Sequence, residues 1–170
     1  ATTALQNADV ELVLRMTASG ASVTIKAQVY KLGNGVMTLI FERTEFDGIG
    51  IIGTAGNVTL GVYNQASGAS VSAAFDNLQA FDMISGVIDN FNVAGGSPPP
   101  GWSIGTLAGS GTASNDAGAL HMVGSPAGGS PFISRDSPTF TVTDGSKLEF
   151  RVDVVNNVVA ADTHAALGYS

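Results

Sequence analysis

The stretch that decides the fold is AAFDNLQAFDMISGVIDNFNV, residues 73–93, which contains the dipeptide Asp-Asn twice. Asp76-Asn77 and Asp89-Asn90 stand thirteen residues apart, each in a short run where apolar and polar residues alternate. Such alternation is typical of a half-buried β-strand. The stretch therefore predicts two strands, joined by a connector at residues 83–86.

The same two-residue period continues on both sides of this stretch. The dipeptide Asn34-Gly35 is the strongest hairpin signal, because Asn and Gly tolerate the positive φ of a type I′ turn. Short strands are expected at residues 10–16, 23–29, 37–43, 49–52, 58–62, 71–75, 119–123, 140–142, 148–154 and 165–169. The segments 95–101, 105–118 and 124–130 are rich in Gly, Ser, Ala or Pro and are expected as loops. Many short strands between turn signals predict an all-β sandwich.

Composition narrows the class of protein. Charged residues are only 12% of the 170, with a net charge of −7. With so few charges, electrostatic repulsion between copies of the chain is weak, which indicates that part of the surface is buried against other copies. The alternative is an extracellular domain whose surface is covered by Thr, Ser and Asn. The seven scattered basic residues exclude a basic nucleic-acid-binding patch, and the lack of Cys excludes disulfides and thiolate metal sites. No apolar run approaches the roughly 18 residues of a membrane span.

Taken together, these motifs resemble the concanavalin A-like jelly-roll superfamily, particularly the laminin-G-like or glucanase-like domains of exported bacterial proteins. Such domains open with a D-[DN]-F segment, a Trp and a G-x-L turn, and close with paired strands and F-D-N. The corresponding residues here are Asp89-Asn90-Phe91, Trp102 and Gly118-Ala119-Leu120, then Leu12-Val13-Leu14, Val23-Thr24-Ile25, Leu60-Gly61-Val62-Tyr63 and Phe75-Asp76-Asn77. The resemblance implies an antiparallel jelly-roll β-sandwich of a secreted or cell-surface protein.

The order of the two halves departs from the family pattern. The closing half comes first, at residues 1–83, and the opening half second, at residues 84–170, the two together making about one domain. Three arrangements satisfy this order. The chain is one circularly permuted sandwich, or a tandem repeat cut in the middle of a domain, or a subunit whose halves are completed by a neighbouring copy.

Calcium is the metal that the sequence favours. The two Asp-Asn pairs are expected side by side on neighbouring strands, and Ca²⁺ binds carboxylate, amide and carbonyl oxygens. Related jelly rolls bind a structural Ca²⁺ near their terminal strands, which implies Asp76 and Asp89 as ligands, with Asn77 or Asn90 helping. The alternative is that Asp-Asn simply marks strand ends and turns.

Sugar binding in this superfamily uses an aromatic platform with polar neighbours. The resemblance implies Tyr30, Tyr63 and Asn64 as glycan contacts, because Tyr30 and Tyr63 are expected on outward faces. Exposed tyrosines without any ligand are the alternative interpretation.

Nothing in the sequence predicts an enzyme. The E-x-D-x-x-E spacing of the superfamily's glucanases is absent, and Glu149 and Asp153 are separated by Arg151 on a strand face. No G-x-S-x-G elbow is present, and His121 and His164 lack metal-ligand spacing.

We therefore expect a non-enzymatic extracellular building block that assembles with copies of itself into a fibre or array by docking strands or sheet edges. The regions expected to make these contacts are Ala1 to Val10 and Ala161 to Ser170. The alternative is a carbohydrate-binding or adhesion module that recognises glycans.

Overall fold

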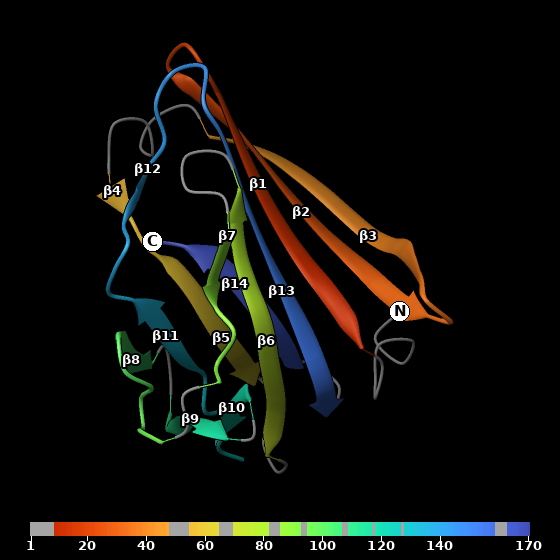
Figure 1. Cartoon of the computed structure of the whole chain (residues 1–170), viewed down its shortest axis with the longest axis vertical. Helices are drawn as coiled ribbons and strands as arrows, with labels where there is room; N and C mark the ends of the chain where they lie inside the picture. Colours follow the sequence, from red (N-terminus) through yellow and green to blue (C-terminus); the bar gives the residue numbers. More distant parts are fainter. Residues whose placement is uncertain are drawn as a thin grey trace.

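A computed structural model describes residues 9–47, 55–64, 70–81, 86–92, 95–106, 109–116, 118–126, 128–158 and 163–170. Within these residues the regular elements are β-strands and every strand pairing is antiparallel. An eight-stranded and a four-stranded sheet pack against each other (Figure 1). The predicted all-β sandwich is thus confirmed.

The large sheet has the strand order β3-β2-β1-β13-β6-β10-β9, with β7 also paired to β6. Its strands are β1 (Val10–Ser19), β2 (Ser22–Gly33), β3 (Val36–Asp47), β6 (Val71–Phe81), β7 (Gly86–Asp89), β9 (Gly111–Asp116), β10 (Ala119–Gly124) and β13 (Lys147–Val158). The small sheet, of order β14-β5-β11-β8, contains β5 (Val58–Asn64), β8 (Trp102–Thr106), β11 (Pro131–Arg135) and β14 (Thr163–Tyr169). A two-stranded ribbon joins β4 (Ala55–Gly56) to β12 (Phe140–Thr141).

In both sheets, strands from one half of the sequence lie between strands from the other half. In the large sheet β13 lies between β1 and β6, and in the small sheet β5 lies between β11 and β14. The register of β1 with β13 runs unbroken from Val10 opposite Val154 to Thr17 opposite Lys147. The described strands of residues 1–83 and 84–170 therefore pair with each other inside one chain.

The core lies between the two sheets. Phe75, Phe150 and Met16 from the large sheet and Leu60 and Ile133 from the small sheet are almost completely buried. Aromatic rings close the end of the core near the carboxyl terminus: the Phe150 ring meets that of Phe140 edge-on at 4.9 Å and stacks at 6.3 Å on Tyr169.

One of the expected loops, residues 105–118, contains strands instead. β8 ends inside it at Thr106, and β9 (Gly111–Asp116) lies wholly within it. The reason is close packing: a Cβ built on Gly105 would overlap the Phe132 ring, and one on Gly111 would lie 2.6 Å from Pro131 Cδ. The strand expected at residues 49–52 lies outside the described residues.

Strand β6, in the segment 73–93, contains a β-bulge. The register of β6 with β13 shifts between Asp76 and Gln79, and Asn77 has a φ of 51°. This extra residue allows both Phe75 and Leu78, three positions apart, to be buried in the core. Asp76 consequently lies on the outer face of the large sheet, opposite Asp153.

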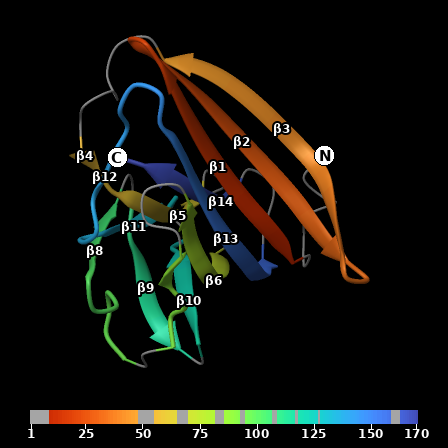
Figure 2. The same ribbon diagram turned by 45° about the horizontal axis from the view of Figure 1, so that its top comes forward.

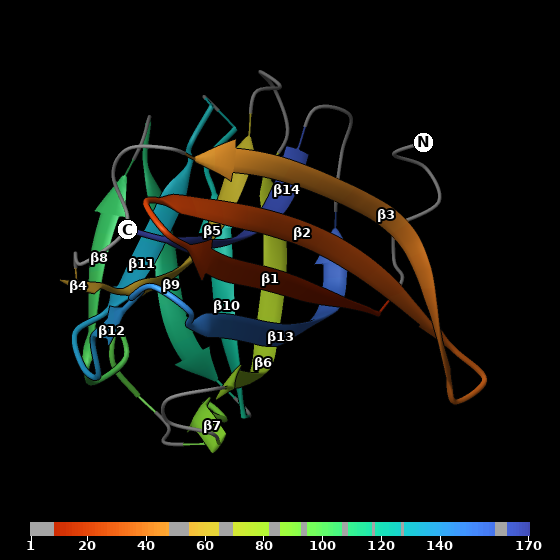
Figure 3. The same cartoon turned by 90° about the horizontal axis from the view of Figure 1, so that it is seen from above.

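The β2–β3 hairpin forms one end of the large sheet. Its turn residues Asn34 and Gly35 have φ values of 53° and 75°, which confirms the positive φ values predicted for this turn. The turn of the hairpin projects away from the small sheet (Figure 2), and β3 lies at the edge of the large sheet, beside β2 (Figure 3).

Candidate interaction surfaces

Strand β3 is an exposed and apolar sheet edge. It terminates the large sheet, and among the described residues no strand pairs with its outer side. Seven large apolar side chains of the β2–β3 hairpin are between 41% and 71% exposed: Leu32, Val36, Met37, Leu39, Ile40, Phe41 and Phe46. Unpaired backbone groups beside exposed apolar side chains are what a further strand needs in order to bind.

Charged side chains occupy the middle of this edge. Arg43 and Glu45, both well exposed, form an ion pair at 2.6 Å. On the other face of β3, Glu42 accepts hydrogen bonds from Gln28 at 2.7 Å and Lys26 at 3.3 Å. Hydrogen bonds from Gln28 and then Lys26 hold the pKa of Glu42 below its usual value. Acidic and basic side chains therefore lie close together along this edge, in the order Glu42, Arg43 and Glu45.

An ion-pair network covers the outer face of the large sheet. Glu149 accepts hydrogen bonds from both Arg15 and Arg151, and Arg15 also donates to Gln28 at 2.7 Å. Val13 lies among these side chains and is only 2% exposed. The long polar side chains thus shield an apolar residue from water, which leaves this face less available to a partner.

Asp76 and Asn77 use their side chains within the sheet. Asp76 Oδ1 accepts a hydrogen bond from the backbone N–H of Asn77 at 2.7 Å, and Asn77 Nδ2 donates to Asp153 at 3.0 Å. Both contacts lie on the outer face of the large sheet, beside the bulge.

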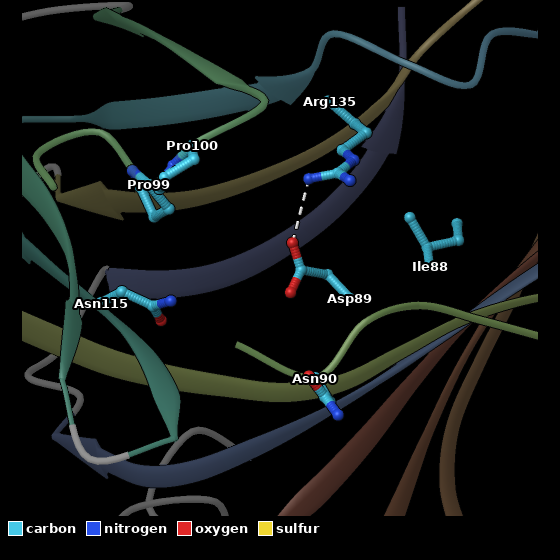
Figure 4. A pocket seen from close by; sticks show the side chains of 7 residues that line it. All are labelled: Ile88, Asp89, Asn90, Pro99, Pro100, Asn115 and Arg135. Atoms are coloured by element: carbon cyan, nitrogen blue, oxygen red, sulfur yellow. Dashed lines mark hydrogen bonds and ion pairs between the residues drawn. The ribbon is translucent and has the colours of Figure 1, made fainter. Parts of the chain in front are cut away.

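Asp89 instead faces the small sheet. Its carboxylate accepts hydrogen bonds from Phe91 N at 2.8 Å, Trp102 Nε1 at 2.9 Å and Arg135 Nη1 at 3.0 Å. Figure 4 shows the Arg135 bond inside a cavity of about 400 Å³. The lining residues are Ile88, Asp89, Asn90, Pro99, Pro100, Asn115 and Arg135.

The four residues predicted to hold calcium do not converge. Asp76 and Asp89 lie on opposite faces of the large sheet, and Asn90 Oδ1 accepts a hydrogen bond from the Asn92 backbone at 3.4 Å. Within the described part of the chain, no three His, Cys, Asp or Glu side chains are grouped to hold a metal ion. Calcium binding stays a prediction, and these positions do not favour one ion shared by both aspartates.

Arg135 is the member of this cluster that sequence reasoning missed. It is the last residue of β11, stacks at 5.4 Å on the Trp102 ring, and donates from Nε to the Ser137 carbonyl at 2.8 Å. Asp89 and Trp102 were both recognised in the sequence, but no local pattern connects either residue to an arginine more than thirty positions away. Arg135 is therefore held by an anion and an aromatic ring of its own chain.

The two tyrosines predicted to bind glycans lie on opposite faces of the sandwich. Tyr30 is on the outer face of the large sheet, opposite Glu11. Tyr63 is on the outer face of the small sheet, where it lines a groove of about 280 Å³ together with Gly61, Phe132 and Ala166. They do not form one platform, and the side chain of Asn64 lies outside the described residues.

The remaining residues singled out in the sequence are placed as follows. His121 is half-buried on β10, opposite Ala74 and Ser114. The backbone of His164 pairs with Tyr63, and its side chain lies outside the described part. Two regions were expected to contact other copies. Their residues 1–8 and 161–162 lie outside the described part of the chain. Val10 and β14, which belong to the same two regions, pair with strands of their own chain.

No protein-family model matches this chain, and no curated protein matches it significantly. Among the described residues, no helix is long and apolar enough to cross a membrane. The function must therefore be argued from the surfaces themselves.

Proposed function

We propose that this chain is a non-enzymatic extracellular building block that associates with copies of itself through its sheet edges. The observation that carries the proposal is the β2–β3 hairpin, with its unpaired outer strand and exposed apolar side chains. The low charged fraction, 12%, supports it, since weak mutual repulsion favours association. The absence of Cys fits an exported protein that does not depend on oxidation.

The edge lacks some of the features that prevent strand pairing. Natural edge strands are commonly short or contain Pro or Lys, whereas β3 has twelve residues and neither. One β-bulge interrupts the pairing of β3 with β2, between the β3 residues that lie opposite Val29 and Tyr30. Residues 41–47 beyond this bulge form a regular segment that is long enough to accept another strand.

The finer structural part of the proposal is a permuted jelly roll. The motif order in the sequence supports it, and so does the pairing of residues 1–83 with residues 84–170 inside the chain. Such pairing favours a self-contained sandwich over halves completed by a neighbour. In that case assembly uses the free edges of finished sandwiches.

Self-association is tested by light scattering and negative-stain imaging over a range of protein concentrations. We expect dimers or larger assemblies whose fraction rises with concentration. Phe46→Lys puts a charge on the exposed edge and should shift the population to monomers. Thr139→Lys, in an exposed loop, makes the same change of net charge and should leave assembly unchanged. A wild-type chain that stays monomeric at all concentrations contradicts the proposal.

A second candidate is carbohydrate binding in the groove on the small sheet. The favouring observation is that Tyr63 and Phe132 lie on one face of the small sheet and line the same groove as Gly61 and Gly168. Aromatic rings beside an open floor suit stacking of a sugar ring. An oligosaccharide array tests this: binding that is lost in Phe132→Ala and kept in Tyr30→Ala supports it, and no binding to any glycan excludes it.

A further inference from the structure

The direction of the β2 backbone shows which β3 residues face the free edge. Leu32 N–H donates to the Asp9 carbonyl at 3.1 Å, so Leu32 directs its backbone groups toward β1 and not toward β3. In an antiparallel sheet this direction reverses at every residue. The register of β1 with β2 is unbroken from Val10 to Ser19, so every second residue of β2 shares the direction of Leu32.

This alternation assigns the outward groups of β3. In β2, the backbone groups that bond to β1 include those of Gln28, Lys26 and Thr24. These three residues lie opposite Glu42, Thr44 and Phe46 of β3. A β3 residue that does not bond to β2 directs its N–H and C=O to the other side. The backbone groups of Glu42, Thr44 and Phe46 therefore point away from the sheet, available to a further strand.

The charges between these residues select the partner strand. Arg43 and Glu45 flank Thr44 and share one face of β3. In an antiparallel pair with an identical strand centred on Thr44, each Arg43 lies opposite the Glu45 of the other copy. Moving the centre one residue either way sets Arg43 against Arg43, or Glu45 against Glu45, and like charges directly opposite are destabilising.

We propose that two copies of this chain pair through β3, antiparallel, about a two-fold axis at Thr44. This inference rests on the proposed self-association and specifies its geometry. The outward backbone groups of Glu42, Thr44 and Phe46 bond to the same groups of the second copy, which joins both large sheets into one. Arg43 and Glu45 lie in the closer, non-hydrogen-bonded positions, where opposite charges interact best.

A two-fold contact of this kind closes on itself. The same surface is used on both copies, so the β3 interface alone makes a dimer and not a fibre. Any longer assembly has to grow from other edges of the described sheets, which include β9, β8 and β14. The dimer is then the repeating unit of such an assembly.

Charge reversal tests the register. Arg43→Glu sets Glu against Glu twice, and Glu45→Arg sets Arg against Arg twice, so each variant alone should dimerise about tenfold more weakly than wild type. An equal mixture of the two variants restores opposite charges at both positions and should regain wild-type dimerisation. The measurement is sedimentation velocity, with circular dichroism showing that each variant is folded. A register that places like residues opposite each other predicts a different pattern: neither variant alone dimerises more weakly than wild type, and the mixture dimerises more strongly than wild type.

Disulfide cross-linking gives a second, independent measurement. The chain has no native Cys, so Thr44→Cys introduces a single thiol on the proposed axis. The Cα atoms of a directly opposed pair are about 5.5 Å apart, within the range of a disulfide. Mild oxidation should produce a covalent dimer from Thr44→Cys and not from Thr38→Cys, an exposed control on the same strand.

The outcomes separate the two proposals. A monomeric wild-type chain overturns self-association and the β3 dimer together. Wild-type dimers that persist unchanged in Arg43→Glu and Glu45→Arg, with equal cross-linking at positions 38 and 44, overturn the two-fold register and leave self-association standing.

Discussion

Trp102 donates its indole N–H to the carboxylate of Asp89 at 2.9 Å, and this bond joins the large sheet to the small one. Asp89 ends β7, Trp102 begins β8, and both belong to the motif that prompted the jelly-roll resemblance. The same Asp89 oxygen accepts a hydrogen bond from Arg135 at 3.0 Å. One carboxylate therefore links three strands, β7, β8 and β11.

Removing this carboxylate should destabilise the fold. Asp89→Ala leaves the Trp102 and Arg135 donors without their acceptor in a largely buried place, for which we expect a loss of about 2 kcal/mol in unfolding free energy. Urea denaturation measures it. Asp116→Ala, at the exposed end of β9, is the control and should change stability by less than about 0.5 kcal/mol. Equal effects of the two substitutions would contradict the role given to Asp89.

Gly56 has no room for a side chain. A Cβ at this position would lie 2.7 Å from Tyr169 Cε1 and 2.8 Å from the Ser170 carbonyl oxygen. We expect Gly56→Ala to cost about 1–3 kcal/mol, because the terminal strand β14 has to shift. Gly33→Ala is the matched control, since nothing lies within 4 Å of its added Cβ. Thermal unfolding of both variants decides the point, and an unchanged midpoint for Gly56→Ala would disprove the close packing.

Tyr169 should make stability decrease at alkaline pH. Its hydroxyl donates to the Phe140 carbonyl at 2.7 Å, and burial raises the pKa of the phenol above its ordinary value of 10.0. A group with a raised folded pKa contributes stability below the unfolded pKa and loses it as pH rises through the folded pKa. Tyr169→Phe should therefore cost about 1 kcal/mol at pH 7 and flatten the decline above pH 10. Denaturant titrations from pH 7 to 11 measure both effects; parallel declines in the two proteins would exclude this assignment.

Glu149 should make the stability of the fold decrease at acidic pH. Burial raises the pKa of its carboxyl, but hydrogen bonds from Arg15 and Arg151 outweigh burial and bring the pKa below the ordinary 4.5. A depressed folded pKa stabilises the fold above the unfolded pKa, and this stabilisation is lost as pH falls through the folded pKa. Glu149→Gln should be about 1 kcal/mol less stable than wild type at pH 7. The difference should vanish at strongly acidic pH, and a pH-independent difference would count against the ion pairs.

Calcium binding can be measured directly by isothermal titration. If Asp76 and Asp89 share one ion, as the sequence analysis expects, then Asp76→Asn and Asp89→Asn should each abolish the same binding event. The structure places them on opposite faces of the large sheet, so loss in only one variant would show that any bound ion is held by that residue and its own neighbours. EDTA should lower the unfolding midpoint only if a site is present.

Local residues were sufficient to predict the strands and the hairpin turn. The alternation around Leu12 and Val152 needs only neighbours in the chain, and the Asn34-Gly35 turn depends on the φ preferences of those two residues. The loop expected at residues 105–118 was wrong, because Gly105 and Gly111 make room for Phe132 and Pro131, which the local pattern does not show.

The candidate sites depended on pairings between distant residues. The Asp-Asn repeats predicted a shared calcium site, but the bulge at Asn77 turns Asp76 outward while Arg135 and Trp102 hold Asp89 toward the small sheet. Likewise the sequence showed the apolar residues of β3 without showing that β3 would end the sheet. The sequence by itself determined most of the residues that form strands, since strand period and turn preference are local properties. Only the tertiary structure decided which edge stays unpaired and which carboxylate faces which sheet, because both follow from hydrogen-bonded registers between strands far apart in the chain.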